Sequence, residues 1–365
     1  MKCGVIGLPN VGKSTLFNAI TRAGAEAANY PFCTIEPNTG VTAVPDARLA
    51  ALTDMYHPKK TTPALVEFVD IAGLVKGASK GEGLGNKFLS HIREVDALVH
   101  VVRCFDDSNV QHVDGRVDPV RDAEVVNLEL ILADLDTVER REDRARKSVK
   151  TGDKKTALEA DTAAKIRAHL EGEQPVRTCA LTSEEREIAR GWFLLTDKPV
   201  LYAANIGEDQ IGLPEDTLPG IPELKALAAK ERAETLVISA RVEADIAAME
   251  PEDKALFLEE LGIGQPGLDR FAKASYKLLG LISFLTAGAD EVRAWTIREG
   301  DRAPQAAGKI HTDFERGFIR AEIVAFDALM REGGMAACKE KGLVRSEGKD
   351  YVMKDGDVAL FRFNV

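Results

Sequence analysis

The sequence lacks any long hydrophobic run and holds few cysteines. No apolar stretch approaches the roughly 18 residues that a membrane helix needs, so we expect no membrane partner. The chain runs from Met1 straight into an apolar strand pattern, and we therefore expect no signal peptide. Its five cysteines are scattered, odd in number and without the spacing of metal ligands. These features predict a cytoplasmic protein with reduced thiols.

Positive charge is also scarce. The 48 Lys and Arg residues are outnumbered by 59 Asp and Glu residues, and the net charge of −11 argues against a general nucleic-acid coat. Charged residues make up 29% of the chain and the mean hydropathy is −0.15, values that fit a globular protein. A length of 365 residues predicts two or three domains.

The first motif lies directly behind a short apolar run. Residues 7–14, with the sequence GLPNVGKS, match the phosphate-binding pattern G-x-x-x-x-G-K-[ST]. Its glycines let backbone N–H groups converge on phosphates, at the positive end of the following helix. Lys13 would contact the outer phosphates and Ser14 would ligate Mg²⁺. A plain glycine turn would need neither residue, so the motif predicts a nucleotide site made of Asn10, Val11, Gly12, Lys13, Ser14 and Thr15.

Two further segments supply partners for this loop. Residues 65–70 form an apolar strand pattern ending in Asp70, where an acid can hold a water of the Mg²⁺ shell. Gly73 can approach the terminal phosphate because it has no side chain. Thr34 would be a second hydroxyl ligand of the metal. We expect the glycine-rich residues 73–85 and the loop around Thr34 to order on nucleotide binding and to be released on hydrolysis.

The base-reading segment departs from the guanine pattern. The strand pattern at residues 199–204 ends in Asn205-Ile-Gly-Glu208, where GTPases carry Asn-Lys-x-Asp. Ile206 replaces the lysine and Glu208 is one methylene longer than aspartate, so the carboxylate contacts with guanine are not preserved. Asn205 can pair with the N6/N7 edge of adenine, although it also reads as a plain strand-to-loop residue. Ser239 and Ala240 would contribute backbone contacts on the other side of the base.

The sequence also lacks the usual water-positioning glutamine. Leu74 stands where Ras-like enzymes place it, so another group must act or turnover must be slow. His112 follows the strand pattern at residues 97–102, in a loop at the carboxyl edge of the expected sheet. We hypothesise that His112 helps to position the water; the alternative is a histidine that caps loop backbone. His100, in mid-strand, is expected to be a satisfied core histidine.

Residues 120–195 predict an antiparallel helical hairpin. Apolar residues recur at three- and four-residue steps, which predicts a buried stripe of Val125, Leu128, Leu132, Leu135 and Val138. Between Arg140 and Lys155, eight basic residues face three acidic ones, a local charge of +5. We expect this tip to contact rRNA phosphates in a salt-sensitive manner; a merely solvated hairpin end is the alternative.

Short strand patterns dominate the chain after residue 280. We predict strands at Val292–Ile297, Phe318–Val324 and Tyr351–Met353, with a helix at Pro304–Lys309. Lys354-Asp-Gly356 would be the turn of a final hairpin. No catalytic constellation is visible here, so we assign a docking role, with a purely structural cap as the alternative.

Together these motifs resemble the YchF/Obg-like ATPase family, a branch of the Obg-type translation-factor GTPases. The matching segments are residues 7–15, 29–37, 70–85, 205–208, 292–296 and 310–315. The resemblance implies an α/β fold, with a P-loop NTPase G domain of the Obg type at residues 1–278 and a mostly parallel, doubly wound sheet. It also implies a hairpin insertion at about 120–195 and a β-grasp TGS domain at residues 280–364, similar to that of threonyl-tRNA synthetase.

The resemblance further implies a preference for ATP over GTP and a role at the ribosome, on the large subunit or the 70S particle. We therefore expect a monomeric, Mg²⁺-dependent cytoplasmic ATPase whose nucleotide state controls ribosome binding. Two alternatives stay open: an Obg-like GTPase, and a nucleotide-gated ribosome adaptor with incidental turnover. The sequence does not decide whether K⁺ or an activator accelerates hydrolysis.

Overall fold

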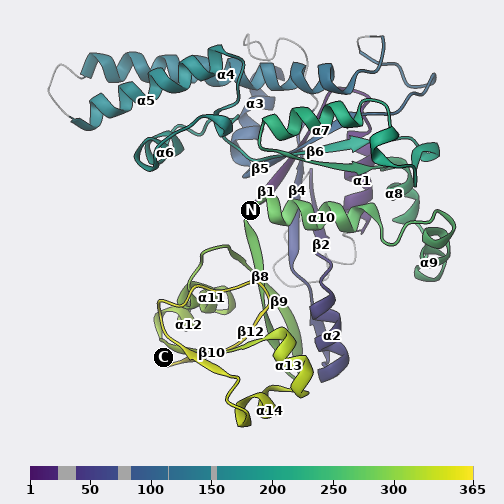
Figure 1. The fold of residues 1–365 in the computed structure, drawn as a ribbon, viewed down its shortest axis with the longest axis vertical. Coiled ribbons are helices and arrows are strands. Elements are labelled where there is room, and N and C mark those ends of the chain that lie inside the picture. The colour runs from purple at the N-terminus through teal and green to yellow at the C-terminus, as the bar shows by residue number, and fades with distance from the viewer. Residues whose placement is uncertain (24–37, 73–83, 114, 149–153, 365) are drawn as a thin grey trace. The chain divides into compact units, whose positions relative to one another are not determined.

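A computed structural model describes residues 1–23, 38–72, 84–113, 115–148 and 154–364 (Figure 1). The chain divides into two compact units. Among the described residues, the first comprises Met1–Ala23, 38–40 and Glu67–Phe271, and the second comprises Val41–Val66 and 272–364.

A six-stranded sheet with the order β2-β4-β1-β5-β6-β7 forms the centre of the nucleotide fold. β1 pairs in parallel with β4 and β5, and β6 pairs in parallel with β5 and β7. Every residue of β5 is buried, as expected for a strand covered on both faces. The parallel strands bring their carboxyl ends to one edge of the sheet, where such folds bind ligands. The strands are β1 (Lys2–Ile6), β2 (Thr39–Ala43), β4 (Leu65–Asp70), β5 (Ala97–Arg103), β6 (Val200–Asn205) and β7 (Glu234–Ile238).

Helices follow most of these strands and complete the α/β fold. Phe68 of β4 stacks on Phe271 of α10 with ring centres 5.0 Å apart, which ties that helix to the sheet. The α/β P-loop fold that the motifs predicted is thereby confirmed. The helices of this part are α1 (Lys13–Ala23), α3 (Leu84–Glu94), α7 (Ile221–Lys230), α8 (Ala240–Ile246), α9 (Pro251–Glu260) and α10 (Gly267–Leu278).

The predicted helical hairpin is present as α4 (Pro119–Ser148) and α5 (Lys154–Glu171), which lie side by side (Figure 1). It is followed by α6 (Ser183–Arg190), whose first turn is closed by a capping box between Thr182 and Glu185. The hairpin core lies between the three helices, and its buried members include Ile131, Val138, Ile166 and Trp192.

The predicted apolar stripe on α4 was partly wrong. Leu128 and Leu132 are 40% and 38% exposed, whereas Val126, Leu130 and Ile131 are buried. Because α4 packs against both α5 and the sheet, its buried face is wider than one stripe. This face includes positions next to the predicted ones, such as Val126 and Leu130. The three- and four-residue spacing predicted the helix correctly but not which side is covered.

A second six-stranded sheet has the order β11-β10-β12-β8-β9-β3. β8 and β9 are antiparallel, and so are β10 and β12. Helix α11 (Ala303–Ile310), expected at Pro304–Lys309, contributes buried alanines to the core around Phe284 and Phe361. The strands are β3 (Lys60–Thr62), β8 (Leu281–Ala287), β9 (Glu291–Arg298), β10 (Phe318–Ala325), β11 (Arg345–Glu347) and β12 (Asp357–Phe363).

This second unit takes in more of the chain than residues 280–364. β3 pairs in parallel with β9, and α2 (Ala47–Tyr56) belongs to the same unit. The sequence pattern could not reveal this, because the partner strand lies more than 200 residues away. The domain limits and the β-grasp interpretation stay predictions.

The predicted final hairpin was wrong. Val352 forms only an isolated bridge with Arg302, so no strand occupies Tyr351–Met353. The Gly356 N–H instead donates to the carbonyl of Ser283, and β12 pairs with β10 and β8. Three short helices that we did not predict also occur here: α12 (Thr312–Arg316), α13 (Phe326–Glu332) and α14 (Met335–Glu340).

Four of the five cysteines lie in the described residues. Cys3, Cys104, Cys179 and Cys338 are buried and free; Cys33 lies outside the described residues. Across the part of the chain that the structure describes, no helix has both the length and the apolar character needed to cross a bilayer.

His100 lies in the core, as predicted, but is not satisfied. Its side chain is on β5 beside the Tyr202 ring, 5.3 Å between ring centres, and the residue is 2% exposed. Nδ1 has no hydrogen-bond partner within the described residues. Burial, helped by the nearby positive charge of Arg177, lowers the pKa of His100 from 6.5 to about 3.

We predict that His100 makes the protein less stable in acid. Between pH 6.5 and about 3 the unfolded chain binds a proton at this histidine and the folded chain does not. The free energy of unfolding should therefore fall by about 1.4 kcal/mol for each unit that the pH drops in this window, and this slope should vanish above pH 6.5. Urea unfolding of wild type and His100→Phe across this range measures the slope as a difference.

The difference between the two proteins is the decisive quantity. The pKa of buried Asp134 is raised to about 6, so protonation of Asp134 makes the free energy of unfolding rise as the pH falls. This contribution is the same in wild type and in His100→Phe and cancels in the difference. His91→Phe, at an exposed position of α3, is the matched control and should keep the wild-type slope. Parallel stability curves for wild type and His100→Phe would contradict the prediction.

Candidate nucleotide-binding site

The turn between β1 and α1 is a tight backbone loop. Gly12 has a φ of 91°, in the left-handed region that favours glycine. A Cβ atom there would lie 2.2 Å from Nδ2 of Asn205, and one on Gly7 would lie 2.7 Å from the carbonyl oxygen of Val101. Since α1 starts directly after Gly12, the loop leads into a helix N-terminus, the geometry that binds anions.

Lys13 and Asp70 meet at the carboxyl edge of the sheet. Lys13 is the first residue of α1, and Asp70 is the last residue of β4, in register with Val5 of β1. Their side chains form an ion pair and are 11% and 25% exposed. The structure therefore brings together the lysine expected at the outer phosphates and the acid expected near the metal.

The oxygen donors at this point fit Mg²⁺. Ser14 is exposed in the first turn of α1, beside the Lys13–Asp70 pair. A hydroxyl and a carboxylate are donors that suit Mg²⁺, which keeps several waters and takes phosphate oxygens as further ligands. No group of three or more His, Cys, Asp or Glu side chains that could hold a metal occurs among the described residues. Thr34 and Gly73 lie outside the described residues.

Asn205 connects the phosphate loop to the loops of β6 and β7. Its Nδ2 donates to the carbonyl of Val11 at 2.8 Å, and its Oδ1 accepts from the N–H of Ala240 at 2.8 Å. The residue is only 4% exposed. Each polar atom keeps one further hydrogen-bonding position, so direct pairing of Asn205 with adenine stays a prediction. Its visible role is to hold loops together.

A cavity of about 750 Å³ opens beside this asparagine. It brings together residues from the phosphate loop, the loop after β5, the loop after β6 and the start of α8. Of the predicted nucleotide residues it contains Gly12, Thr15, Asn205, Ile206, Glu208 and Ala240. The others that line it are Phe105, Asp106, Asp107, Ser108, Val110, Gly207, Asp209 and Arg241.

Sequence reasoning missed Arg103, which holds one wall of this cavity. Its side chain is 1% exposed and donates to the carbonyls of Phe105, Asp107 and Val110 at 3.1, 3.3 and 2.9 Å. The guanidinium carbon lies 4.6 Å from the centre of the Phe105 ring. An arginine at the end of an otherwise apolar strand pattern, residues 97–103, was the available signal.

The two residues that depart from the guanine pattern differ in exposure. Ile206 is 7% exposed, and its N–H donates to the carbonyl of Ile238 at 2.9 Å. The Glu208 side chain is 60% exposed, and its Oε1 lies 3.5 Å from Nε of Arg241. The carboxylate on this loop therefore already has a cationic partner within the protein.

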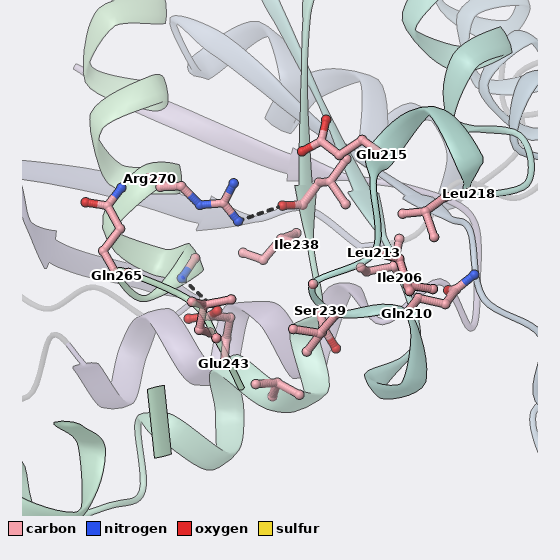
Figure 2. Close-up of a pocket in the computed structure, with 18 residues that line it drawn as sticks. Ile206, Gln210, Leu213, Glu215, Leu218, Ile238, Ser239, Glu243, Gln265 and Arg270 are labelled. Atoms are coloured by element: carbon pink, nitrogen blue, oxygen red, sulfur yellow. Dashed lines mark hydrogen bonds between the residues drawn. The ribbon is translucent and has the colours of Figure 1, made fainter. Parts of the chain in front are cut away.

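Ser239 and Ala240 face different cavities. Ala240 lines the large cavity, whereas Ser239 lines a neighbouring one of about 380 Å³ together with Ile206, Glu243 and Arg270 (Figure 2). The Ser239 hydroxyl is buried without a hydrogen-bond partner in the described part of the chain. Ile206, the residue that the two cavities share, forms part of the wall between them.

His112 is buried close to the phosphate loop. Its Nε2 lies 2.7 Å from Oδ2 of Asp122 in the first turn of α4, and the two side chains are 4% and 2% exposed. The carbonyl of the preceding Gln111 accepts from Nδ2 of Asn10 at 3.1 Å. The loop thus touches the phosphate loop while the His112 ring is held by α4. Its role in positioning water stays a prediction.

Comparison with known proteins gives a consistent result over the whole chain. A family profile described as a 50S ribosome-binding GTPase matches residues 2–134, and a C-terminal YchF-GTPase profile, described as a protein of unknown function, matches residues 281–364. The Bacillus subtilis protein named ribosome-binding ATPase YchF is 56% identical over 365 residues, with all of both chains covered. The chain belongs to the YchF family.

Other relatives agree with this assignment. The Escherichia coli O157:H7 protein of the same name is 53% identical over 364 residues, covering 100% of this chain and 99% of the relative. The solved structure of the Schizosaccharomyces pombe YchF GTPase is 38% identical with a TM-score of 0.89, covering 99% of this chain and 97% of that one. The family resemblance drawn from the motifs is therefore confirmed.

We predict that the Asn205 amide stabilises this YchF-family fold as well as its site. Asn205→Ala leaves the buried Val11 carbonyl and Ala240 N–H unpaired, which should lower the free energy of unfolding by roughly 2–4 kcal/mol. Urea unfolding measures this loss. Asn18→Ala, on the exposed face of α1, is the control and should change stability by less than about 0.5 kcal/mol. Equal stability of the two variants would show that the link is dispensable.

Proposed function

We propose that the protein is a Mg²⁺-dependent ATPase that binds ribosomes, and that its nucleotide state controls this binding. The observation that carries the proposal is the cavity beside the phosphate loop. At this cavity Asn205 connects the phosphate loop to the segment expected to contact the base. Relatives named ribosome-binding ATPases, similar along their full length, support both the activity and the partner.

Each part of the site has a distinct role. The backbone of Asn10, Val11 and Gly12 and the amine of Lys13 bind the phosphates. Ser14, Asp70 and Thr34 hold Mg²⁺, which neutralises charge on the phosphate oxygens when it is bound. Gly73 gives close access to the terminal phosphate, and His112 positions the attacking water.

Selection of adenine is supported by what the loop after β6 lacks. A guanine-reading carboxylate must point its oxygens at the base, but Glu208 is mostly exposed and lies beside Arg241. Ile206 offers an apolar, buried side chain where a lysine would be expected. Ala240 and Ser239 contribute backbone on the opposite side. The Schizosaccharomyces pombe relative is named a YchF GTPase, and this name makes a GTPase the second candidate.

Competition binding decides between the nucleotides. We expect unlabelled ATP to displace a fluorescent ATP analogue at lower concentration than GTP, with Mg²⁺ present. The double change Ile206→Lys with Glu208→Asp should raise GTP affinity roughly tenfold, because a charged hydrogen bond to the base contributes about 1.5–3 kcal/mol. Glu208→Asp alone should produce part of this gain.

Glu223→Asp, at an exposed position of α7, controls for the loss of one methylene and should leave both affinities unchanged. Tighter GTP than ATP binding by wild type would replace the proposal with an Obg-like GTPase. Turnover is compared in KCl and NaCl, because a K⁺ requirement is open. If His112→Ala stops hydrolysis but ribosome release and cellular function persist, the nucleotide-gated adaptor is the better description.

We place the ribosome contact at the far end of the helical hairpin. Part of its positive charge is already paired within the hairpin: Arg140 with Asp136 at 2.5 Å, and Arg146 with Glu142 at 2.6 Å. Arg144 and Lys147 are exposed on the same end of α4. Exposed cations beyond those used in internal pairs support contact with rRNA phosphates around Arg140–Lys155.

The charge reversal Arg144→Glu with Lys147→Glu should weaken ribosome binding. Cosedimentation at several salt concentrations measures it, and the slope of log affinity against log salt should drop by about 2 if each residue meets a phosphate. Lys225→Glu with Lys230→Glu makes the same charge change on α7 and should leave the slope unchanged. Binding and salt slope equal to wild type would mean that the hairpin end is merely solvated.

The remaining assignments follow from this role. We place the protein in the cytoplasm, where ribosomes occur and the buried thiols stay reduced. We propose a monomer with a nucleotide domain at residues 1–278, the hairpin inserted at about 120–195, and a TGS docking domain at residues 280–364.

A further inference from the structure

We propose that Asp122 is a positioning residue that holds His112 away from the nucleotide and thereby limits the basal rate of hydrolysis. The inference rests on the proposed ATPase activity and on the role of His112 in it. It identifies a residue outside the nucleotide motifs, on the first turn of α4.

The geometry around Asp122 is that of an anchored carboxylate. Its Oδ2 lies 2.7 Å from Nε2 of His112, and its Oδ1 accepts from Nε and from a terminal nitrogen of Arg121 at 3.2 and 2.8 Å. Arg121 also donates to the carbonyl of Arg116 at 2.7 Å. The Asp122 N–H donates to the carbonyl of Asp118 at 2.9 Å, within the start of α4. Both carboxylate oxygens therefore have partners, and the helix fixes the backbone.

The His112 side chain is almost completely covered by the protein in this arrangement. It is only 4% exposed, so it offers almost no surface to a nucleotide or a water. Val110 lines the large cavity, and the Gln111 carbonyl contacts Asn10 of the phosphate loop. His112 itself is not among the described residues that line the cavity. The chain thus passes the cavity at Val110 and then brings His112 into contact with the first turn of α4.

The proposal involves two positions of His112, of which the structure shows the first. In one the ring is bound to Asp122, and in the other it lies at the nucleotide. The observed rate is proportional to the fraction of molecules in the second position. The 2.7 Å contact of Nε2 with Oδ2, on a carboxylate whose other oxygen is held by Arg121, favours the first position.

The test is Asp122→Asn, which keeps the shape of the side chain and removes its charge. Single-turnover hydrolysis of ATP without ribosomes should become faster, on the order of tenfold, while the affinity for ATP stays the same. The gain should disappear in the double variant Asp122→Asn with His112→Ala, because it depends on the released ring. Glu124→Gln removes the same charge at an exposed position two residues further along α4 and should leave the rate unchanged.

A second readout reports the position of His112 directly. Diethyl pyrocarbonate modifies accessible histidines, and mass spectrometry of peptides gives the rate at each one. In wild type, His112 should react far more slowly than His91, which is exposed on α3. In Asp122→Asn, modification of His112 should become faster while that of His91 does not change. The wild-type comparison remains decisive if the variant does not fold.

The outcomes separate this inference from the proposed function. Wild type without ATP hydrolysis would defeat the proposed function, whereas His112→Ala with the wild-type rate would defeat only the role of His112 and with it this inference. If wild type hydrolyses ATP and His112→Ala is slow, a rate in Asp122→Asn that is unchanged or lower overturns the holding role. A reactivity of wild-type His112 equal to that of His91 overturns it as well.

Discussion

The hydrogen bonds of a single buried amide connect the parts of this site. Asn205, at the end of β6, binds the Val11 carbonyl of the phosphate loop and the Ala240 N–H at the start of α8. The fit is close, since any side chain on Gly12 would collide with the same amide. The loops expected to contact phosphate and base are therefore fixed to one another by the protein. A ligand that moves one of these loops would therefore also move the other.

The parts of the fold that sequence could predict are those set by local chemistry. Residues 7–14 combine glycines, lysine and serine in a spacing that backbone geometry demands, and Asp70 ends an apolar strand pattern. The capping box at Thr182 and Glu185 is likewise a local rule. Partners far along the chain decide the rest. β3 joins β9 through a pairing that no short segment encodes, and Leu128 is exposed because α4 is covered on another side.

The same contrast between local patterns and distant contacts applies to the site. Sequence reasoning named six of the described residues that line the cavity, but not what their atoms bind. Asn205 appeared as a base contact, and the structure shows its amide bonded to backbone. Arg103 was overlooked because its function is to hold carbonyl groups of its own loop, a task with no motif. His112 was selected by its place in a loop, and only the folded chain reveals its partner on α4.

The unbroken helix α4 makes one arm of the hairpin stiff. The helix runs for 30 residues without an internal glycine or proline, so no hinge interrupts it. Asp122 and Arg144 lie at opposite ends, about 33 Å apart along the axis at 1.5 Å per residue. A stiff helix of this length can act as a lever arm, because a force on its far end would reach its base as a small displacement. A hydrogen bond of 2.7 Å at that base is the kind of contact that a small displacement breaks.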